Sequence, residues 1–154
     1  MFPDGYRVRT YGEVQDLPLL ARTMTAAYSG LWGHHAVSPE DLTPWLPALR
    51  PDGVFLLFDE PSDAVGICRG ELRESRAEET GKPMGYVDAP GIVRTRRDDD
   101  LYIPLLLTAM RWLRAQGIGT IGLESWGDDE DTLQPYREIG FTDARRAISH
   151  RFDL

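Results

Sequence analysis

The sequence predicts an α/β domain with a mixed central sheet and helices on both of its faces. With 154 residues and 42% hydrophobic content, residues 1–154 are expected to form a single domain that buries its own core. Strand-like runs with alternating or continuous apolar residues are interspersed with segments of helical period. The strongest helical segment, 105–116, lies between two apolar strands, and such a crossover makes these two strands parallel in an otherwise antiparallel sheet.

The first half of the chain is expected to contain one strand and two helices. Asp16 is a suitable N-cap, and Pro18 fits the first turn of the helix that follows it. Ser38 and Pro39 form a second helix start, and the prolines that follow should keep this helix short. A strand is expected at residues 6–10, a helix at 16–28 and a loop at 29–37, and the second helix is expected to start at residue 38.

The second half is expected to add five strands and two helices. Residues 73–82 are densely charged and are predicted to connect a hairpin to the next strand. Leu105, Leu106, Ala109 and Leu113 form the apolar face of the strongest helix, with a glycine at its C-terminal cap. The strands are expected at 54–58, 64–72, 86–93, 120–126 and 142–152, and the helices at 105–116 and 131–139.

Composition and charge exclude several classes of function. The formal net charge of −8 would repel a nucleic-acid backbone, whereas the same field favours the approach of a cationic amine. The longest apolar stretch, 103–107, is far shorter than the roughly 20 residues that span a bilayer. The first residues show no secretory signal, and the single Cys68 cannot form an internal disulfide and is expected to be buried as a small hydrophobe. A cytoplasmic protein without nucleic-acid or membrane partners is therefore predicted.

Motifs between residues 85 and 141 resemble the GNAT N-acetyltransferase superfamily. These motifs fall into two groups of segments. The first group is similar to the strand, pyrophosphate loop and helix of that family's coenzyme-binding motif, and the second group is similar to a later strand and helix of the family. The resemblance is closest to mycothiol-synthase-like domains, which often occur as two per chain, and therefore implies a possible homodimer. The matching segments are 85–93, 96–97, 105–107 and 112–113 in the first group, and 123–128 and 136–141 in the second.

The family's pyrophosphate loop reads Arg or Gln, two variable residues, Gly, one variable residue, and Gly or Ala. Arg97 matches the first position, whereas Asp100 and Tyr102 replace the two small residues. The loop carboxylates would oppose a diphosphate by on the order of 1 kcal/mol per close pair, and Pro104 predicts a helix that begins late. The resemblance implies an acetyl-CoA site, with acetyl-CoA as co-substrate, at Val93, Arg94, Arg97, Asp98, Asp99, Asp100, Leu101 and Tyr102.

The charged residues of this loop have further interpretations. Arg94, Arg96 and Arg97 could compensate for the lost glycines through charge-assisted contacts to phosphate. We interpret the three consecutive aspartates, 98–100, as N-capping and helix-dipole carboxylates. A metal site is the less favoured interpretation, because no further oxygen ligands accompany the aspartates at suitable spacing.

Five candidate residues for catalysis or acceptor binding lie outside this loop. By resemblance, Tyr136 is the general acid that protonates the departing thiolate; the alternative is an aromatic side chain that packs the last helix. Asp88 and Glu124 lie on strands that flank the central gap and are candidate general bases, although either could simply face solvent. Trp32 and His34 lie in the loop 29–37 and are candidate acceptor contacts; the alternative for His34 and the adjacent His35 is that they only form part of the loop surface.

Two functions remain open. In the first, the chain transfers acetyl from acetyl-CoA to a primary amine of a small molecule or peptide. In the second, it is a non-catalytic GNAT-fold module for binding or assembly that no longer binds acetyl-CoA, as the loss of both loop glycines suggests.

Overall fold

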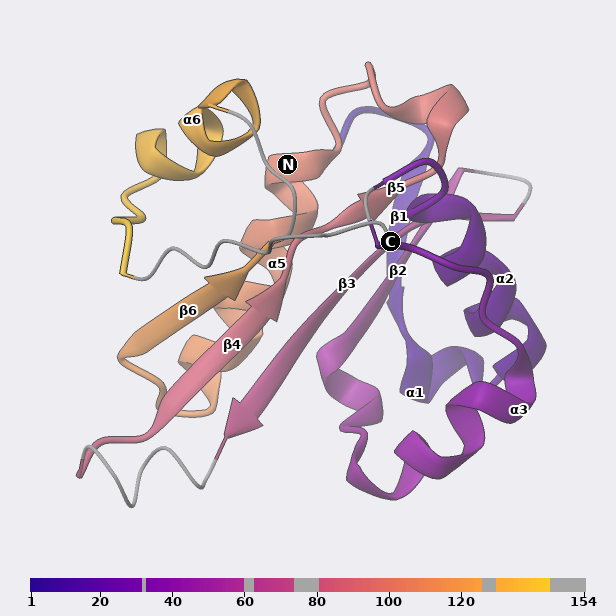
Figure 1. Ribbon diagram of the computed structural model, residues 1–154, viewed down its shortest axis with the longest axis horizontal. Coiled ribbons are helices and arrows are strands. Elements are labelled where there is room, and N and C mark those ends of the chain that lie inside the picture. The colour runs from indigo at the N-terminus through magenta and orange to yellow at the C-terminus, as the bar shows by residue number, and fades with distance from the viewer. Residues whose placement is uncertain (32, 60–62, 74–80, 126–129, 145–154) are drawn as a thin grey trace, which may run out of the picture.

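The computed structural model describes residues 1–31, 33–59, 63–73, 81–125 and 130–144, and contains a six-stranded mixed sheet (Figure 1). The strand order is β1-β2-β3-β4-β6, and β5 pairs with β3 beside this path. All neighbouring strands are antiparallel except β4 and β6, which are parallel as the crossover predicts. The strands are β1 (Tyr6–Thr10), β2 (Val54–Asp59), β3 (Ala64–Arg73), β4 (Met84–Asp88), β5 (Gly91–Ile92) and β6 (Thr120–Glu124).

Helices cover both faces of the sheet, and each face has its own apolar core. Leu56 and Leu57 are consecutive in β2 and therefore point to opposite faces. Leu56 packs in the core under α2, and Leu57 in the core under α5. The helices are α1 (Tyr11–Val14), α2 (Leu17–Ala27), α3 (Pro39–Leu42), α5 (Tyr102–Ala115) and α6 (Glu130–Glu138), with short 3-10 turns at Thr43–Ala48, Pro51–Gly53 and Arg94–Arg96.

The crossover helix α5 packs closely on the sheet. Its predicted apolar face is buried, with Leu105 and Leu106 fully so. Gly70 and Gly85 permit the close approach, because a Cβ at either position would lie 2.9 Å or less from side chains of α5. The helix begins at Tyr102, so the expectation of a late start is wrong. Pro104 lies in the first turn, where backbone amides have no partner within the helix and a missing donor costs nothing.

The predicted strand 86–93 is two strands, β4 and β5, separated by Ala89 and Pro90. Val87 pairs with Gly70 of β3, and Gly91 pairs with Ile67. Two residues of β3 therefore face three residues of the neighbouring segment, as in a β-bulge. Proline, which lacks a backbone amide, fits this unpaired position.

Two predicted strands, 120–126 and 142–152, extend beyond the residues that the structure describes. The predicted strand 120–126 ends at Glu124, and residue 126 lies outside them. Residues 142–144 are not in a strand, and the rest of the predicted strand 142–152 also lies outside the described residues. No helix in the described part of the chain is both long enough and apolar enough to cross a membrane.

Candidate active site

The candidate site lies where β4 and β6 stop pairing. Asp88 and Glu124 are the last pair in the parallel register between these strands. Beyond them, the chain continues from β4 into β5, which pairs with β3, while β6 ends. The two strands therefore diverge at the position of the two candidate bases, which the register brings side by side on the same sheet face.

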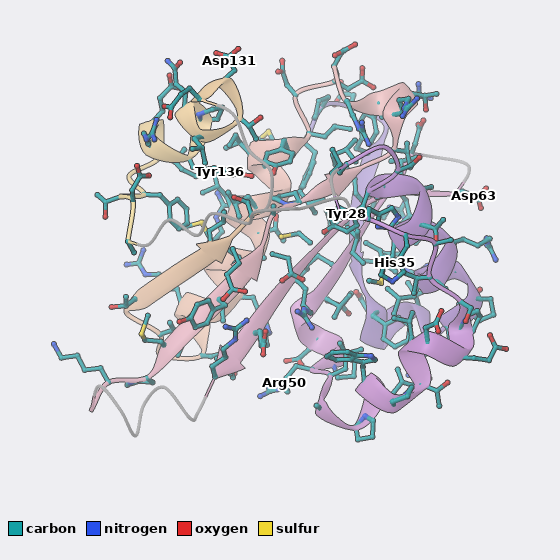
Figure 2. The ribbon with its side chains drawn as sticks, in the orientation of Figure 1. Tyr28, His35, Arg50, Asp63, Asp131 and Tyr136 are labelled. Atoms are coloured by element: carbon teal, nitrogen blue, oxygen red, sulfur yellow. The ribbon has the colours of Figure 1, made fainter. Side chains whose placement is uncertain are left out.

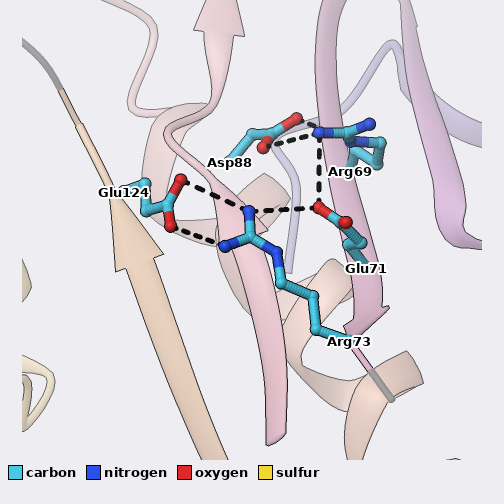
Figure 3. Close-up of polar contacts among 5 residues, drawn as sticks. All are labelled: Arg69, Glu71, Arg73, Asp88 and Glu124. Atoms are coloured by element: carbon cyan, nitrogen blue, oxygen red, sulfur yellow. Dashed lines mark hydrogen bonds and ion pairs between the residues drawn. The ribbon is translucent and has the colours of Figure 1, made fainter. Parts of the chain in front are cut away.

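A line of alternating charges crosses this face of the sheet (Figure 3). Arg69 of β3 donates to both carboxylate oxygens of Asp88, at 2.9 and 3.3 Å. Arg73 donates to both oxygens of Glu124, at 2.8 and 3.3 Å. Glu71 lies between the two arginines, 3.6 Å from Arg69 and 3.3 Å from Arg73. We call these five residues the charge line.

The carboxylates of the charge line are accessible to a substrate. The side chains of Asp88 and Glu124 are 40% and 49% exposed. The hydrogen bond to Glu124 raises the pKa of Arg73. For Arg69, burial acts to lower the pKa, but the charge and hydrogen bond of Asp88, together with the charge of Glu71, outweigh burial and raise the pKa. Both arginines therefore remain cationic, and both flanking carboxylates are held by bidentate contacts.

Tyr86 supports the outer end of the charge line. The guanidinium of Arg73 lies 3.9 Å from the centroid of the Tyr86 ring. The ring in turn covers Gly122 of β6, where a Cβ would come within 2.7 Å of it. Sequence reasoning missed Arg69, Glu71 and Arg73. Arg69 and Glu71 alternate within the predicted strand 64–72 and so share a face, but Arg73 was assigned to the connection 73–82, whereas β3 extends to include it.

The arginines of the expected pyrophosphate loop are mostly engaged elsewhere. Arg97 donates to the backbone oxygens of Ile92, Ala27 and Ser29, at 3.0, 3.2 and 2.9 Å. Arg96 donates to Asp59 at 2.8 and 2.5 Å. Arg94 is exposed, and its guanidinium lies against Gly30, in the space that a Cβ at this position would fill.

Backbone groups of this loop also form hydrogen bonds within the fold. The Val93 amide donates to the Val65 oxygen at 2.8 Å, and the Val93 oxygen accepts from the Arg96 amide at 2.9 Å. Leu101 is 1% exposed and belongs to the α5 core. Of the predicted cofactor residues, Val93, Arg97 and Leu101 therefore already serve the fold.

The interpretation of the three aspartates as helix caps is wrong. The N-cap of α5 is Leu101, which makes no side-chain capping bond, and no acid lies in the first turn. Asp99 instead accepts a hydrogen bond of 2.6 Å from the Tyr6 hydroxyl and lies 3.9 Å from Arg96. Asp98 and Asp100 are exposed. In the part of the chain that the structure describes, no three His, Cys, Asp or Glu side chains converge as a metal site would require.

Asp100 has a left-handed backbone conformation. Its φ is +53°, in the left-handed region that favours glycine. The resemblance places the first loop glycine at this residue. The backbone at this position is therefore one that glycine would adopt without strain, although the residue is an aspartate.

The Tyr6–Asp99 contact predicts alkaline sensitivity. Burial, together with the hydrogen bond to Asp99, raises the pKa of Tyr6 to about 12. Because the folded pKa exceeds that of the unfolded chain, this contribution to stability is complete below about pH 10 and is lost as the pH rises towards 12. We expect urea unfolding between pH 9 and pH 11.5 to show a falling free energy of unfolding, with a shallower fall for Tyr6→Phe. An equal fall in both proteins would contradict the assignment.

Tyr136 projects from α6 towards the sheet (Figure 2). It is 3% exposed, and its hydroxyl is hydrogen-bonded to the hydroxyl of Tyr102 in the first turn of α5. Its ring meets Phe141 edge-on at a centroid distance of 6.4 Å. Tyr136 therefore packs the helix and also presents a polar group to the start of α5, so its two predicted roles are compatible.

The expected acceptor loop follows the end of α2. The His34 ring nitrogen Nε2 lies 3.2 Å from the Thr25 oxygen, and the ring lies 6.0 Å from that of Tyr28. His35 stacks on His34 at 6.4 Å. The other candidate acceptor contact, Trp32, lies outside the described residues.

No known protein-family profile matches the chain, but individual relatives do. It is 30% identical over 147 residues to a mycothiol acetyltransferase of Segniliparus rotundus, covering 92% of this chain and 54% of that protein. A mycothiol acetyltransferase of Rhodococcus erythropolis is 29% identical over 146 residues, covering 90% of this chain and 47% of that protein. The chain thus spans about half the length of these curated relatives.

Solved structures share the architecture at lower identity. An aminoglycoside N-acetyltransferase in complex with CoA superposes with a TM-score of 0.70 at 14% identity, over 100% of both chains. Glucosamine-6-phosphate N-acetyltransferase from Arabidopsis thaliana gives a TM-score of 0.70 at 12% identity, over 96% of this chain and 99% of the other. These likenesses establish the fold that the sequence motifs predict.

Proposed function

We propose that this chain is an N-acetyltransferase of the GNAT superfamily that moves the acetyl group of acetyl-CoA to a primary amine; its similarity to acetyltransferases in sequence and fold supports the proposal. The observation that carries the proposal is the divergence of the parallel strands β4 and β6 beside two exposed carboxylates. Such a gap admits a donor between the strands, and the carboxylates provide a polar surface for an amine. The two relatives from Segniliparus rotundus and Rhodococcus erythropolis are mycothiol acetyltransferases, and their names support the same type of reaction.

The donor would enter between β5 and the end of β6. Because the Val93 amide points to β3, the amide of the preceding Ile92 points away from β3 and can donate to a thioester oxygen. Exposed Arg94 is the loop cation best placed for the diphosphate. Asp98 and Asp100 oppose the diphosphate, so we expect modest affinity for acetyl-CoA.

The reaction needs one proton acceptor and one proton donor. The amine nitrogen attacks the thioester carbon, and Asp88 accepts the proton that the nitrogen releases. The C–S bond then breaks, and Tyr136 donates its proton to the departing sulfur. We assign the base to Asp88 rather than Glu124 because Asp88 directly precedes the strand break, where the thioester would lie.

For the acceptor, we propose a small cationic amine of the amino-sugar type. Acceptors of this kind are named for two structural relatives, the aminoglycoside and glucosamine-6-phosphate acetyltransferases. The acidic net charge of −8 and the three carboxylates of the charge line favour such a cation.

Titration with acetyl-CoA tests the proposal directly. At a thousand times its dissociation constant, a ligand should stabilise the protein by about 4 kcal/mol, which is readily seen as a rise in melting temperature. Release of free thiol from acetyl-CoA would then be followed with glucosamine 6-phosphate and sisomicin as acceptor probes. A melting temperature that acetyl-CoA leaves unchanged would exclude this function.

A non-catalytic GNAT-fold module is the second candidate. It is favoured by the engagement of Arg97 with three backbone oxygens and by the Tyr102 side chain at the position of the family's second small residue. This function predicts that neither acetyl-CoA nor CoA changes the melting temperature.

A further inference from the structure

The strand break between β4 and β5 is held by donors from three other parts of the chain. A break of this kind leaves backbone oxygens without ladder partners, and each needs a donor when buried. The Cys68 thiol lies 3.4 Å from the Asp88 oxygen, and the Tyr28 hydroxyl donates to the Ala89 oxygen at 2.8 Å. Arg97 donates to the Ile92 oxygen at 3.0 Å.

Tyr28 fixes the break through its ring as well as its hydroxyl. A Cβ at Gly91 would lie 2.8 Å from the Tyr28 ring and 3.0 Å from the Ala27 Cβ, so the ring occupies the space that this glycine leaves. Burial, with the nearby Asp88 carboxylate, raises the pKa of the Tyr28 phenol. The phenol therefore remains a protonated donor at neutral pH, and Tyr28 is seen beside the centre of the sheet in Figure 2.

Arg97 ties the same break to the end of α2. Besides the Ile92 oxygen, it binds the Ala27 and Ser29 oxygens, which flank Tyr28 in the sequence. These oxygens lie at the C-terminal end of α2, where the helix dipole favours a cation. Tyr28 and Arg97 thus connect one helix end to both sides of Pro90.

We propose that Tyr28 and Arg97 are positioning residues for the donor. The inference rests on the proposed function. The two side chains fix the Ala89 and Ile92 oxygens, so that the Ile92 amide keeps its direction towards the gap and towards the thioester oxygen. Arg97 then acts on the acetyl end of the donor through the backbone. The family resemblance instead implies that Arg97 acts on the diphosphate.

An acetyl donor that lacks the diphosphate can distinguish whether Arg97 positions the backbone near the thioester or binds the diphosphate. Binding of acetyl-CoA and of S-acetylpantetheine would be measured by NMR titration of the full chain. We expect Tyr28→Phe and Arg97→Ala each to raise the dissociation constants of both ligands by the same factor. This factor should be about tenfold, which corresponds to loss of the one hydrogen bond from the Ile92 amide to the thioester oxygen. Arg94→Ala is the matched arginine control and should weaken acetyl-CoA alone. If Arg97→Ala weakens acetyl-CoA and leaves S-acetylpantetheine unchanged, Arg97 is a phosphate ligand and the proposal is overturned.

Two controls separate positioning from general loss of stability. Arg97→Gln removes the charge but keeps amide donors, and it should recover part of the binding of S-acetylpantetheine. Hydrogen exchange of the Val93 amide, which donates to the Val65 oxygen, should accelerate in Tyr28→Phe, while exchange of the Leu57 amide in β2 should not. This readout requires no ligand. If the wild-type protein binds neither donor, the proposed function fails, and unchanged Val93 exchange would separately overturn the role of Tyr28.

Discussion

Asp88→Asn is expected to lower the turnover number by about 10²- to 10⁴-fold, the usual contribution of a general base. The amide keeps the shape of the carboxylate and can still accept a hydrogen bond from Arg69, but it cannot take a proton from the attacking amine. The Asp88–Arg69 pair is half-buried, but the amide oxygen can still accept from Arg69, so the substitution should cost on the order of 1 kcal/mol of stability. Steady-state kinetics with acetyl-CoA and the best acceptor probe would measure the effect.

Glu124→Gln is the matched control. Glu124 also makes bidentate contacts with an arginine, is similarly exposed, and lies opposite Asp88 in the register. We expect less than a tenfold loss for this variant, because Glu124 ends β6 and does not precede the strand break. A large loss in Glu124→Gln with near-normal turnover in Asp88→Asn would transfer the role of base to Glu124.

Tyr136→Phe is expected to lower turnover by about 10²- to 10⁴-fold and to leave the affinity for acetyl-CoA unchanged. The substitution removes the proton that the departing sulfur would receive, whereas the ring and its edge-on contact with Phe141 remain. Single-turnover kinetics would show the slow step at the cleavage of the thioester. Affinity would be measured separately by calorimetry.

Tyr102→Phe distinguishes loss of the acid from loss of the hydroxyl pair. Both variants break the hydrogen bond between the two hydroxyls, but only Tyr136→Phe removes the proposed acid. We expect the Tyr102 variant to keep most of its turnover. Equal losses in the two variants would mean that the pair acts as a structural unit and that Tyr136 has no separate chemical role.

Local signals in the sequence predicted much of the fold. The Asp16 side chain caps α2 by accepting from the Leu19 amide, and Ser38 caps α3 in the same way. The apolar face of α5 is buried as its period predicts, and Cys68 is fully buried. The short α1 was missed, although Thr10 and Glu13 form a capping box whose spacing is visible in the sequence.

The candidate site was only partly predictable, because its geometry depends on distant segments. The crossover rule places Asp88 and Glu124 on neighbouring strands, but their arginine partners depend on the register with β3. The resemblance presents Arg97 as a phosphate ligand. Its actual partners at Ala27 and Ser29 are about 70 residues away in sequence, and no local pattern reveals them.

The left-handed turn at Asp100 has an evolutionary consequence. Codons for aspartate and glycine differ by a single nucleotide, and the backbone already has the dihedral angle that glycine adopts without strain. One point mutation would therefore remove a negative charge and bring the loop closer to the glycine-containing pattern of the family without refolding it. Close homologues that differ at this codon would form a natural series in which loop charge varies while the surrounding architecture stays constant.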